Sequence, residues 1–370
     1  MHGWTQGQLV DEVPDLTQSR LSRIEKGKAY LDADDLLAAN LAAVTGVTVS
    51  WLSRPSMAGF SSVSPHFRAR SKTTESAKAA GLAWATLVNE AFVGLGGRVS
   101  PLAMQLERHV GEDPRLAAQL TRRSLGFGAL EPLPFLVLAV ERIGVRVLGL
   151  PWTVNTVDAF CAWADPETPA IALTADSPGD RRRWNVAHEL GHLVLHDHDR
   201  QGRDVEAEAD VFAAELLTPL DALRQQMPNN PTLGALTMLK GVWGVSVKSL
   251  VRRARELGAA SDERATSLYR QISSRGWNKV EPGYVPVEKP RALRRIAEVL
   301  YGPSVTESLA TEMGWSYELA SVVMQEQATV DDLPISTDHA MRESSALAKV
   351  TDLHGRHRKM PSRANGASNG

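Results

Sequence analysis

The order of apolar and polar residues along the chain predicts a mainly helical protein with a small β-sheet. Apolar residues recur every three or four positions in most longer segments, which is the spacing of one helix face. Three short apolar runs, separated by Pro-containing turns, are typical of strands instead. We therefore expect an α+β fold. The expected strands are residues 145–150, 159–163 and 170–174; the main helical segments are residues 77–110, 114–125, 133–143, 184–196, 204–217 and 236–257.

Composition narrows the class of protein. The 370 residues are 43% hydrophobic and 23% charged, and the formal net charge of −2 gives no overall attraction to nucleic acid or to an anionic membrane. Cys161 is the single cysteine, which excludes an intramolecular disulfide and fits a reducing compartment. Since no stretch approaches about 18 uninterrupted apolar residues, we expect a cytoplasmic protein without a membrane partner.

The run HELGH at residues 188–192 is the most specific chemical signal in the chain. On a helix, His188 and His192 project from one face and can hold a single metal ion. Glu189 can reach the open position of that metal, where a carboxylate takes a proton from water. Because the flanking residues are apolar at helical spacing, the helix should be mostly buried. Buried ionisable groups require a metal or a polar network, and a helix with two hydrogen-bonded histidines is the alternative.

A second helix, at residues 204–217, can complete such a site. Glu206 and Asp210 lie one turn apart on the same face, so Glu206 can be the third ligand. Asp210 can then accept a hydrogen bond from the far nitrogen of a ligand histidine and fix its orientation. Glu208 points elsewhere in this prediction. His196 competes as third ligand, although three groups spaced four residues apart are too linear for tetrahedral coordination.

These two helices resemble the ImmA/IrrE family of metallopeptidases, which have an attached repressor-type DNA-binding domain. The resemblance covers most of the chain, and the paired helix motifs are its most specific part. It rests on RWNVAHELGHLVLH at 183–196 and EAEADVFAAELLTP at 206–219, and it extends to VSVKSLVRRA at 245–254 and GWNKVEPG at 276–283.

The family resemblance implies a zincin-like core that binds one zinc ion (Zn2+). Its ligands would be His188, His192 and Glu206, and Glu189 would be the catalytic base. The zinc would lower the pKa of a water molecule toward ~7, and Glu189 would accept its proton and return it to the leaving amine. The family also implies a protein substrate, usually a DNA-bound repressor.

The N-terminal residues predict a helix-turn-helix. Thr5 and Thr17 are expected to cap two short helices joined by a turn at residues 14–16. The second helix resembles the recognition helix of the Cro/phage-repressor (XRE) class. Amide and guanidinium groups suit base edges, whereas lysines suit phosphates. The expected base contacts are Gln18, Ser19, Arg20 and Arg23, and the expected DNA-backbone contacts are Lys26 and Lys28.

Two features complicate DNA binding by this module. Residues 1–54 carry five basic and seven acidic side chains, so a monomer should bind weakly and we expect a homodimer. The usual first helix is almost absent, because only four residues precede Thr5. A helical protein-interaction module that does not bind DNA is the alternative. Residues 236–257 repeat the helix-turn-helix spacing, which we interpret as structural support for the metal site rather than as a DNA contact.

Changes in composition and pattern divide the chain into predicted parts. The stretch before residue 77 is rich in serine and proline, and the last residues are basic without an acidic side chain. The parts are a helix-turn-helix domain (1–54), a linker (55–76), a zinc metallopeptidase domain (77–260, with its core at 115–220), a helical C-terminal region (261–337) and a disordered basic tail (338–370).

Two functional hypotheses follow from this organisation. In the first, the chain is a zinc endopeptidase and transcriptional regulator that acts at an operator and cleaves a repressor in stress, prophage or mobile-element control. In the second, it is a DNA-binding regulator, for example the antitoxin-like half of a toxin-antitoxin pair, whose metal domain is a sensor or scaffold. Glu189 favours the first hypothesis, because a scaffold needs no base beside its metal.

Overall fold

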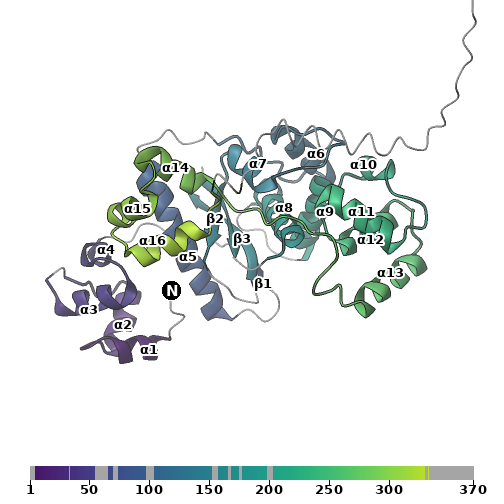
Figure 1. Ribbon diagram of the computed structural model, residues 1–370. Helices are drawn as coiled ribbons and strands as arrows, with labels where there is room; N and C mark the ends of the chain where they lie inside the picture. Colours follow the sequence, from purple (N-terminus) through teal and green to yellow (C-terminus); the bar gives the residue numbers. More distant parts are fainter. Residues whose placement is uncertain are drawn as a thin grey trace, which may run out of the picture. The chain divides into compact units, whose positions relative to one another are not determined.

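The described residues form helices around one small mixed β-sheet (Figure 1), which confirms the predicted mainly α, α+β fold class. Residues 1–329 make up one compact unit and residues 330–370 a second. The predicted basic tail (338–370) and most of the predicted linker lie outside the described residues. The computed structural model describes residues 5–32, 34–54, 66–69, 74–96, 104–151, 157–165, 168–174, 177–197, 203–329 and 332.

The sheet has the strand order β1-β3-β4-β2. β3 and β4 pair antiparallel and β2 runs parallel to β4, on the three segments that the apolar runs predict. β1 comes from the predicted linker and pairs antiparallel with the other edge of β3. An extended peptide could therefore pair with β3 only in place of β1. The strands are β1 His66–Ala69, β2 Arg146–Leu150, β3 Val157–Asp165 and β4 Thr168–Thr174.

The sheet separates two hydrophobic cores, because successive residues of a strand point to opposite faces. Ala159, Cys161 and Trp163 of β3 belong to the core that contains helix α8. Phe160 and Ala162, the residues between them, belong to the core that contains helix α5. Helix α8 is thus packed directly on one face of the sheet and is shielded from solvent on that side.

Helices α6 to α13 contribute to the α8 side of the sheet. Helix α8 contacts β3, β4 and α9, and α6 packs on both α8 and α9. Nearly all residues of α8 are buried, as its apolar flanks predict. The helices are α6 Pro114–Ser124, α7 Leu136–Arg142, α8 Gly179–Leu195, α9 Arg203–Leu217, α10 Leu220–Arg224, α11 Leu233–Trp243, α12 Val247–Glu256 and α13 Asp262–Ser274.

Helix α5 (Glu75–Gly96) packs against β2 on the opposite face, with α14 and α15 beside it. Its residues Ala77–Gly96 are long and apolar enough to cross a membrane by length and composition, and 56% of the apolar window is buried inside the protein. The polar groups that α5 buries have partners: Asn89 accepts a hydrogen bond from Arg146, and Glu90 pairs with Arg54. This is the packing of a core helix.

The N-terminal residues form a small helical bundle with its own core. Thr5 and Thr17 cap the first two helices, as predicted, by accepting hydrogen bonds from backbone N–H groups. Helices α3 and α4 follow, and three further helices close the C-terminal region. The bounds are α1 Gln6–Glu12, α2 Gln18–Glu25, α3 Leu36–Thr45, α4 Val49–Ser53, α14 Ala292–Tyr301, α15 Val305–Met313 and α16 Tyr317–Gln325.

Two similar turns join the N-terminal bundle to the C-terminal helices. Gly46 between α3 and α4 and Gly314 between α15 and α16 both have left-handed backbones, with φ of 73° and 68°. The turns exchange two backbone hydrogen bonds of 2.8 Å, from Thr48 N to the Gly314 carbonyl and from Ser316 N to the Gly46 carbonyl. A Cβ atom at Gly314 would lie 2.7 Å from Thr48 Oγ1. Glycine is therefore required for this close approach.

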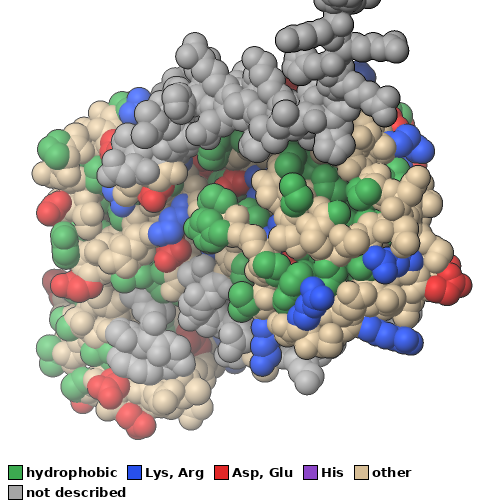
Figure 2. Space-filling model, turned by 45° about the vertical axis from the view of Figure 1, so that its right-hand side comes forward, with side chains coloured by type: hydrophobic (Ala, Val, Ile, Leu, Met, Phe, Trp, Pro, Cys, Tyr) green, Lys and Arg blue, Asp and Glu red, His purple; other side chains and the backbone are tan. Residues whose placement is uncertain are grey.

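Basic and acidic side chains are mixed on the face of the molecule that Figure 2 draws. Lys and Arg are scattered among Asp and Glu there, rather than gathered in a single basic field. This agrees with the net formal charge of −2 over the whole chain.

We predict that Gly314→Ala lowers the free energy of unfolding by about 1–2 kcal/mol or more, because an L-residue in the left-handed region costs about that much before any clash. Gly241→Ala, within α11 where nothing lies within 4 Å of the added Cβ, is the control and should be neutral or stabilising. Urea unfolding of the variants measures the difference. Equal stabilities would contradict the close approach of the two turns.

Candidate metal centre

Helix α8 presents His188 and His192 on one face. Both side chains are buried, with 1% and 2% of their residue surface exposed. Their Nε2 atoms lie 3.1 Å apart. The four-residue spacing on a helix therefore brings the two imidazoles together as the sequence predicts.

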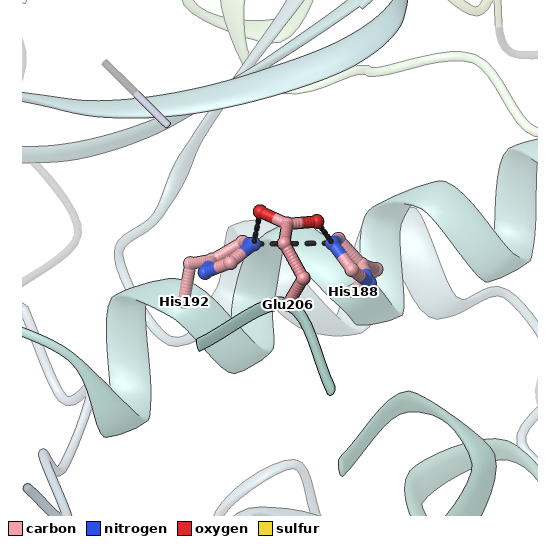
Figure 3. A group of neighbouring side chains, drawn as sticks. All are labelled: His188, His192 and Glu206. Atoms are coloured by element: carbon pink, nitrogen blue, oxygen red, sulfur yellow. Dashed lines mark hydrogen bonds and ion pairs between the residues drawn. The ribbon is translucent and has the colours of Figure 1, made fainter. Parts of the chain in front are cut away.

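Helix α9 lies against α8 because Gly191 leaves room for it. A Cβ at Gly191 would lie 3.0 Å from a ring atom of Phe212 and 3.3 Å from the Cα atom of Ala209, both on α9. This approach carries Glu206 of α9 to the two imidazoles, as Figure 3 shows. The close approach of the two helices is thus part of the site's construction.

The carboxylate of Glu206 faces both imidazoles. Its Oε2 atom lies 3.3 Å from His188 Nε2, and its Oε1 atom lies 3.4 Å from His192 Nε2 (Figure 3). Contacts from His188 and then from His192 hold the pKa of Glu206 well below its usual range. The Glu206 side chain is 48% exposed, so the group opens to solvent on that side.

These separations fit a zinc ion. Two ligand atoms bound tetrahedrally at zinc, each at about 2.0–2.1 Å, lie about 3.3 Å from one another. The two Nε2 atoms are 3.1 Å apart, and each lies 3.3 or 3.4 Å from a different oxygen of the Glu206 carboxylate, close to that separation. Two imidazole nitrogens and one carboxylate oxygen are also the donor types that catalytic zinc takes, with its fourth position left open. The residues present therefore fit the ion.

Glu189 is a buried carboxylate beside the group. It is 0% exposed, its neighbour on β3 is the Cys161 thiol, and neither of its carboxylate oxygens has a nitrogen or oxygen hydrogen-bond partner among the described residues. Burial, and then the negative charge of Glu189, raise the pKa of the Cys161 thiol on β3, as expected for a neutral buried thiol. A thiol is a weak donor, so a buried carboxylate with no stronger partner is costly and calls for a ligand or a catalytic role.

The outer nitrogens of the two imidazoles meet different partners. His188 Nδ1 lies 2.9 Å from Asp210 Oδ1, the contact that the sequence predicts. His192 Nδ1 lies 3.0 Å from His196 Nδ1, whose other nitrogen lies 2.9 Å from Glu208. His196 thus touches the outer side of His192 and is not in the group formed with His188 and Glu206. Sequence reasoning missed this contact, for which the four-residue spacing of His192 and His196 was the available signal.

The residues predicted to contact DNA lie on α2 and the turn that follows it. All six side chains are exposed, as such a role requires. Arg20 forms an ion pair of 2.5 Å with Asp35, the residue that caps α3. The DNA contacts of these residues stay predictions. The residues are Gln18, Ser19, Arg20, Arg23, Lys26 and Lys28.

Two imidazoles from an HExxH helix, a carboxylate from the next helix and a buried glutamate form the arrangement that zinc metallopeptidases of this class use. Residues 140–255 match a zinc metallopeptidase family described as the IrrE N-terminal-like domain. The matched segment contains β2, β3, β4 and the whole metal group, so this part of the chain is similar to a metallopeptidase-family domain. No curated protein matches the chain.

We predict that His188→Ala reduces bound zinc from about one ion per chain to a trace, because the remaining two donors cannot hold a tetrahedral site. His109→Ala, a histidine outside the group, is the matched control and should keep the metal. Elemental analysis after dialysis measures both. Zinc that stays equal in the wild type and His188→Ala would exclude this ligand set.

Proposed function

We propose that the chain is a zinc-dependent endopeptidase in which His188, His192 and Glu206 hold the ion. A zinc ion bound there would polarise a peptide carbonyl and lower the pKa of a water molecule to about 7. Glu189 would accept the proton of that water and return it to the leaving amine nitrogen. The burial of this carboxylate beside the His188, His192 and Glu206 group, without a nitrogen or oxygen partner in the described part of the chain, is the observation that carries the proposal.

The exposure of the site supports a protein substrate. His188 and His192 are buried, whereas Glu206 is half exposed, so a peptide has access from the Glu206 side. The resemblance of the N-terminal module to repressor domains favours a DNA-bound repressor as the substrate. A stress, prophage or toxin-antitoxin setting would supply such a partner.

DNA binding by the N-terminal module is the second part of the proposal. Arg23, Lys26 and Lys28 are exposed on or just after α2, where they can reach phosphates or base edges. Arg20 would first have to leave its ion pair with Asp35. The N-terminal module carries more acidic than basic side chains, and phosphate contacts supply most of the affinity for DNA. A dimer, with two such modules, would therefore bind DNA more tightly than a monomer.

The alternative function is a DNA-binding regulator whose metal domain is a sensor or a scaffold and does not cleave protein. One observation favours it: the N-terminal bundle is joined to α15 and α16 by paired turns, so the two parts are structurally linked. Glu189 argues against it, because metal binding alone needs no buried base.

We predict that Glu189→Gln keeps zinc but loses cleavage by about 100- to 10,000-fold, the usual contribution of a general base. The substrate to use is the repressor encoded beside the chain, with fragments followed by mass spectrometry. Glu112→Gln, an exposed glutamate away from the group, is the control. Cleavage by Glu189→Gln at the wild-type rate would remove the base assignment. Operator binding without cleavage by the wild type would support the alternative.

We predict that Arg23→Ala weakens binding to the intergenic DNA upstream of the chain's own coding sequence. If Arg23 contacts a phosphate, the slope of log affinity against log salt should fall by about one. Lys279→Ala removes one exposed positive charge outside the module and should leave the slope unchanged. Fluorescence anisotropy over a salt series measures both. An affinity for this DNA that is unchanged in Arg23→Ala would contradict a DNA contact at Arg23.

A further inference from the structure

His196 is held at a fixed place next to the metal group. It is the residue at which α8 ends, with an extended backbone (φ −119°, ψ 141°), and it is 1% exposed. Arg108 donates a 2.7 Å hydrogen bond to the His196 carbonyl and a second one to Asp197. These hydrogen bonds fix the end of α8. The His196 ring lies between His192 of α8 and Glu208 of α9.

The ring of His196 connects His192 to a carboxylate of α9. His196 Nδ1 lies 3.0 Å from His192 Nδ1, and His196 Nε2 lies 2.9 Å from Glu208 Oε2. Two ring nitrogens at hydrogen-bond distance share one proton, so one of them must donate and the other must accept. The direction of this contact depends on which tautomer His192 adopts.

Zinc binding settles that direction. If His192 ligates through Nε2, its proton must reside on Nδ1, and His192 donates to His196 Nδ1. His196 then accepts on Nδ1 and carries its own proton on Nε2, which it donates to Glu208. The three residues form a one-way series of hydrogen bonds that ends on a carboxylate.

We propose that His196 and Glu208 are positioning residues that orient His192 for the metal, an inference that rests on the proposed zinc centre. We call the pair the His196–Glu208 relay. It does for His192 what Asp210 does directly for His188, but through an intervening imidazole. Partners of this kind fix the ring orientation of a ligand histidine and raise its basicity, and their loss typically costs about 10- to 100-fold in metal affinity.

The geometry explains why Glu208 differs from Glu206 although both lie on α9. The two residues are two positions apart, so they leave the helix in different directions. Glu206 meets the inner nitrogens of both imidazoles, whereas Glu208 meets the outer nitrogen of His196. Helix α9 thus contacts the outer nitrogen of His188 directly through Asp210, and it supports the outer nitrogen of His192 only through His196.

The test compares two substitutions at His196. His196→Leu fills similar space but removes the acceptor for His192, whereas the side-chain carbonyl of His196→Asn can take the position of the lost Nδ1. We expect His196→Leu to bind zinc about 10- to 100-fold more weakly, and His196→Asn to stay close to wild type. Competition with a chromogenic chelator measures the zinc affinity.

Two further measurements separate positioning from simple packing. The visible spectrum of the cobalt-substituted protein should change in His196→Leu and not in His196→Asn, because it reports ligand geometry. Urea unfolding of the metal-free variants gives the stability cost of each substitution alone. If His196→Leu does not fold, Glu208→Ala and Glu208→Gln take its place, and only Glu208→Ala should weaken zinc binding, because glutamine retains an acceptor oxygen.

The outcomes distinguish this inference from the proposed function. A wild-type protein that takes up no zinc would overturn the metal centre and the relay together. A wild type that binds zinc no more tightly than His196→Leu would overturn the relay alone, as would an equal loss in His196→Asn. If the zinc affinity of each variant changes only in proportion to the stability of its metal-free form, His196 has a packing role, and the inference is contradicted.

Discussion

The close packing of α8 against α9 is the constraint on which the site depends. Gly191 has no Cβ, and the space that it leaves is taken by Phe212 and the backbone of Ala209. Only at this separation does Glu206 reach both imidazoles. A larger residue at position 191 would force α9 outward, and the three donor atoms would no longer lie within the span of one ion.

Much of the surrounding structure holds α8 in place. Near its N-terminus, Arg182 donates to the Thr174 carbonyl at the end of β4, and Arg183 donates to the Gly244 carbonyl and pairs with Glu288. These buried arginines donate to backbone carbonyls and pair with a carboxylate, contacts that lower the cost of burying a cation. The C-terminal segment around Glu288 therefore belongs to the support of the metal helix, a role that its sequence alone did not reveal.

The sequence predicts the site better than it predicts the site's surroundings. The spacing of His188 and His192, and of Glu206 and Asp210, defines helix faces, so their inward contacts could be anticipated. The four-residue spacing of His192 and His196 was the one signal for their ring contact, and it did not suffice, because α8 ends at Leu195 and the position of the next ring depends on tertiary packing. Glu208 was expected to point elsewhere, and it does point away from the ligand group, toward a histidine that sequence reasoning had weighed only as a ligand. The strand β1 within the predicted linker was also missed, because pairing between distant segments leaves little trace in local pattern.

The central claim is that two imidazoles and one carboxylate enclose a single zinc ion. X-ray absorption at the zinc edge of the loaded protein tests it most directly, because nitrogen or oxygen ligands lie at about 2.0–2.1 Å and sulfur at about 2.3 Å. The account predicts nitrogen and oxygen neighbours only, with the multiple-scattering signature of two imidazoles, and a loss of the bound zinc in His192→Ala. A sulfur neighbour, such as the thiolate of Cys161, or zinc that stays fully bound in His192→Ala, would contradict it.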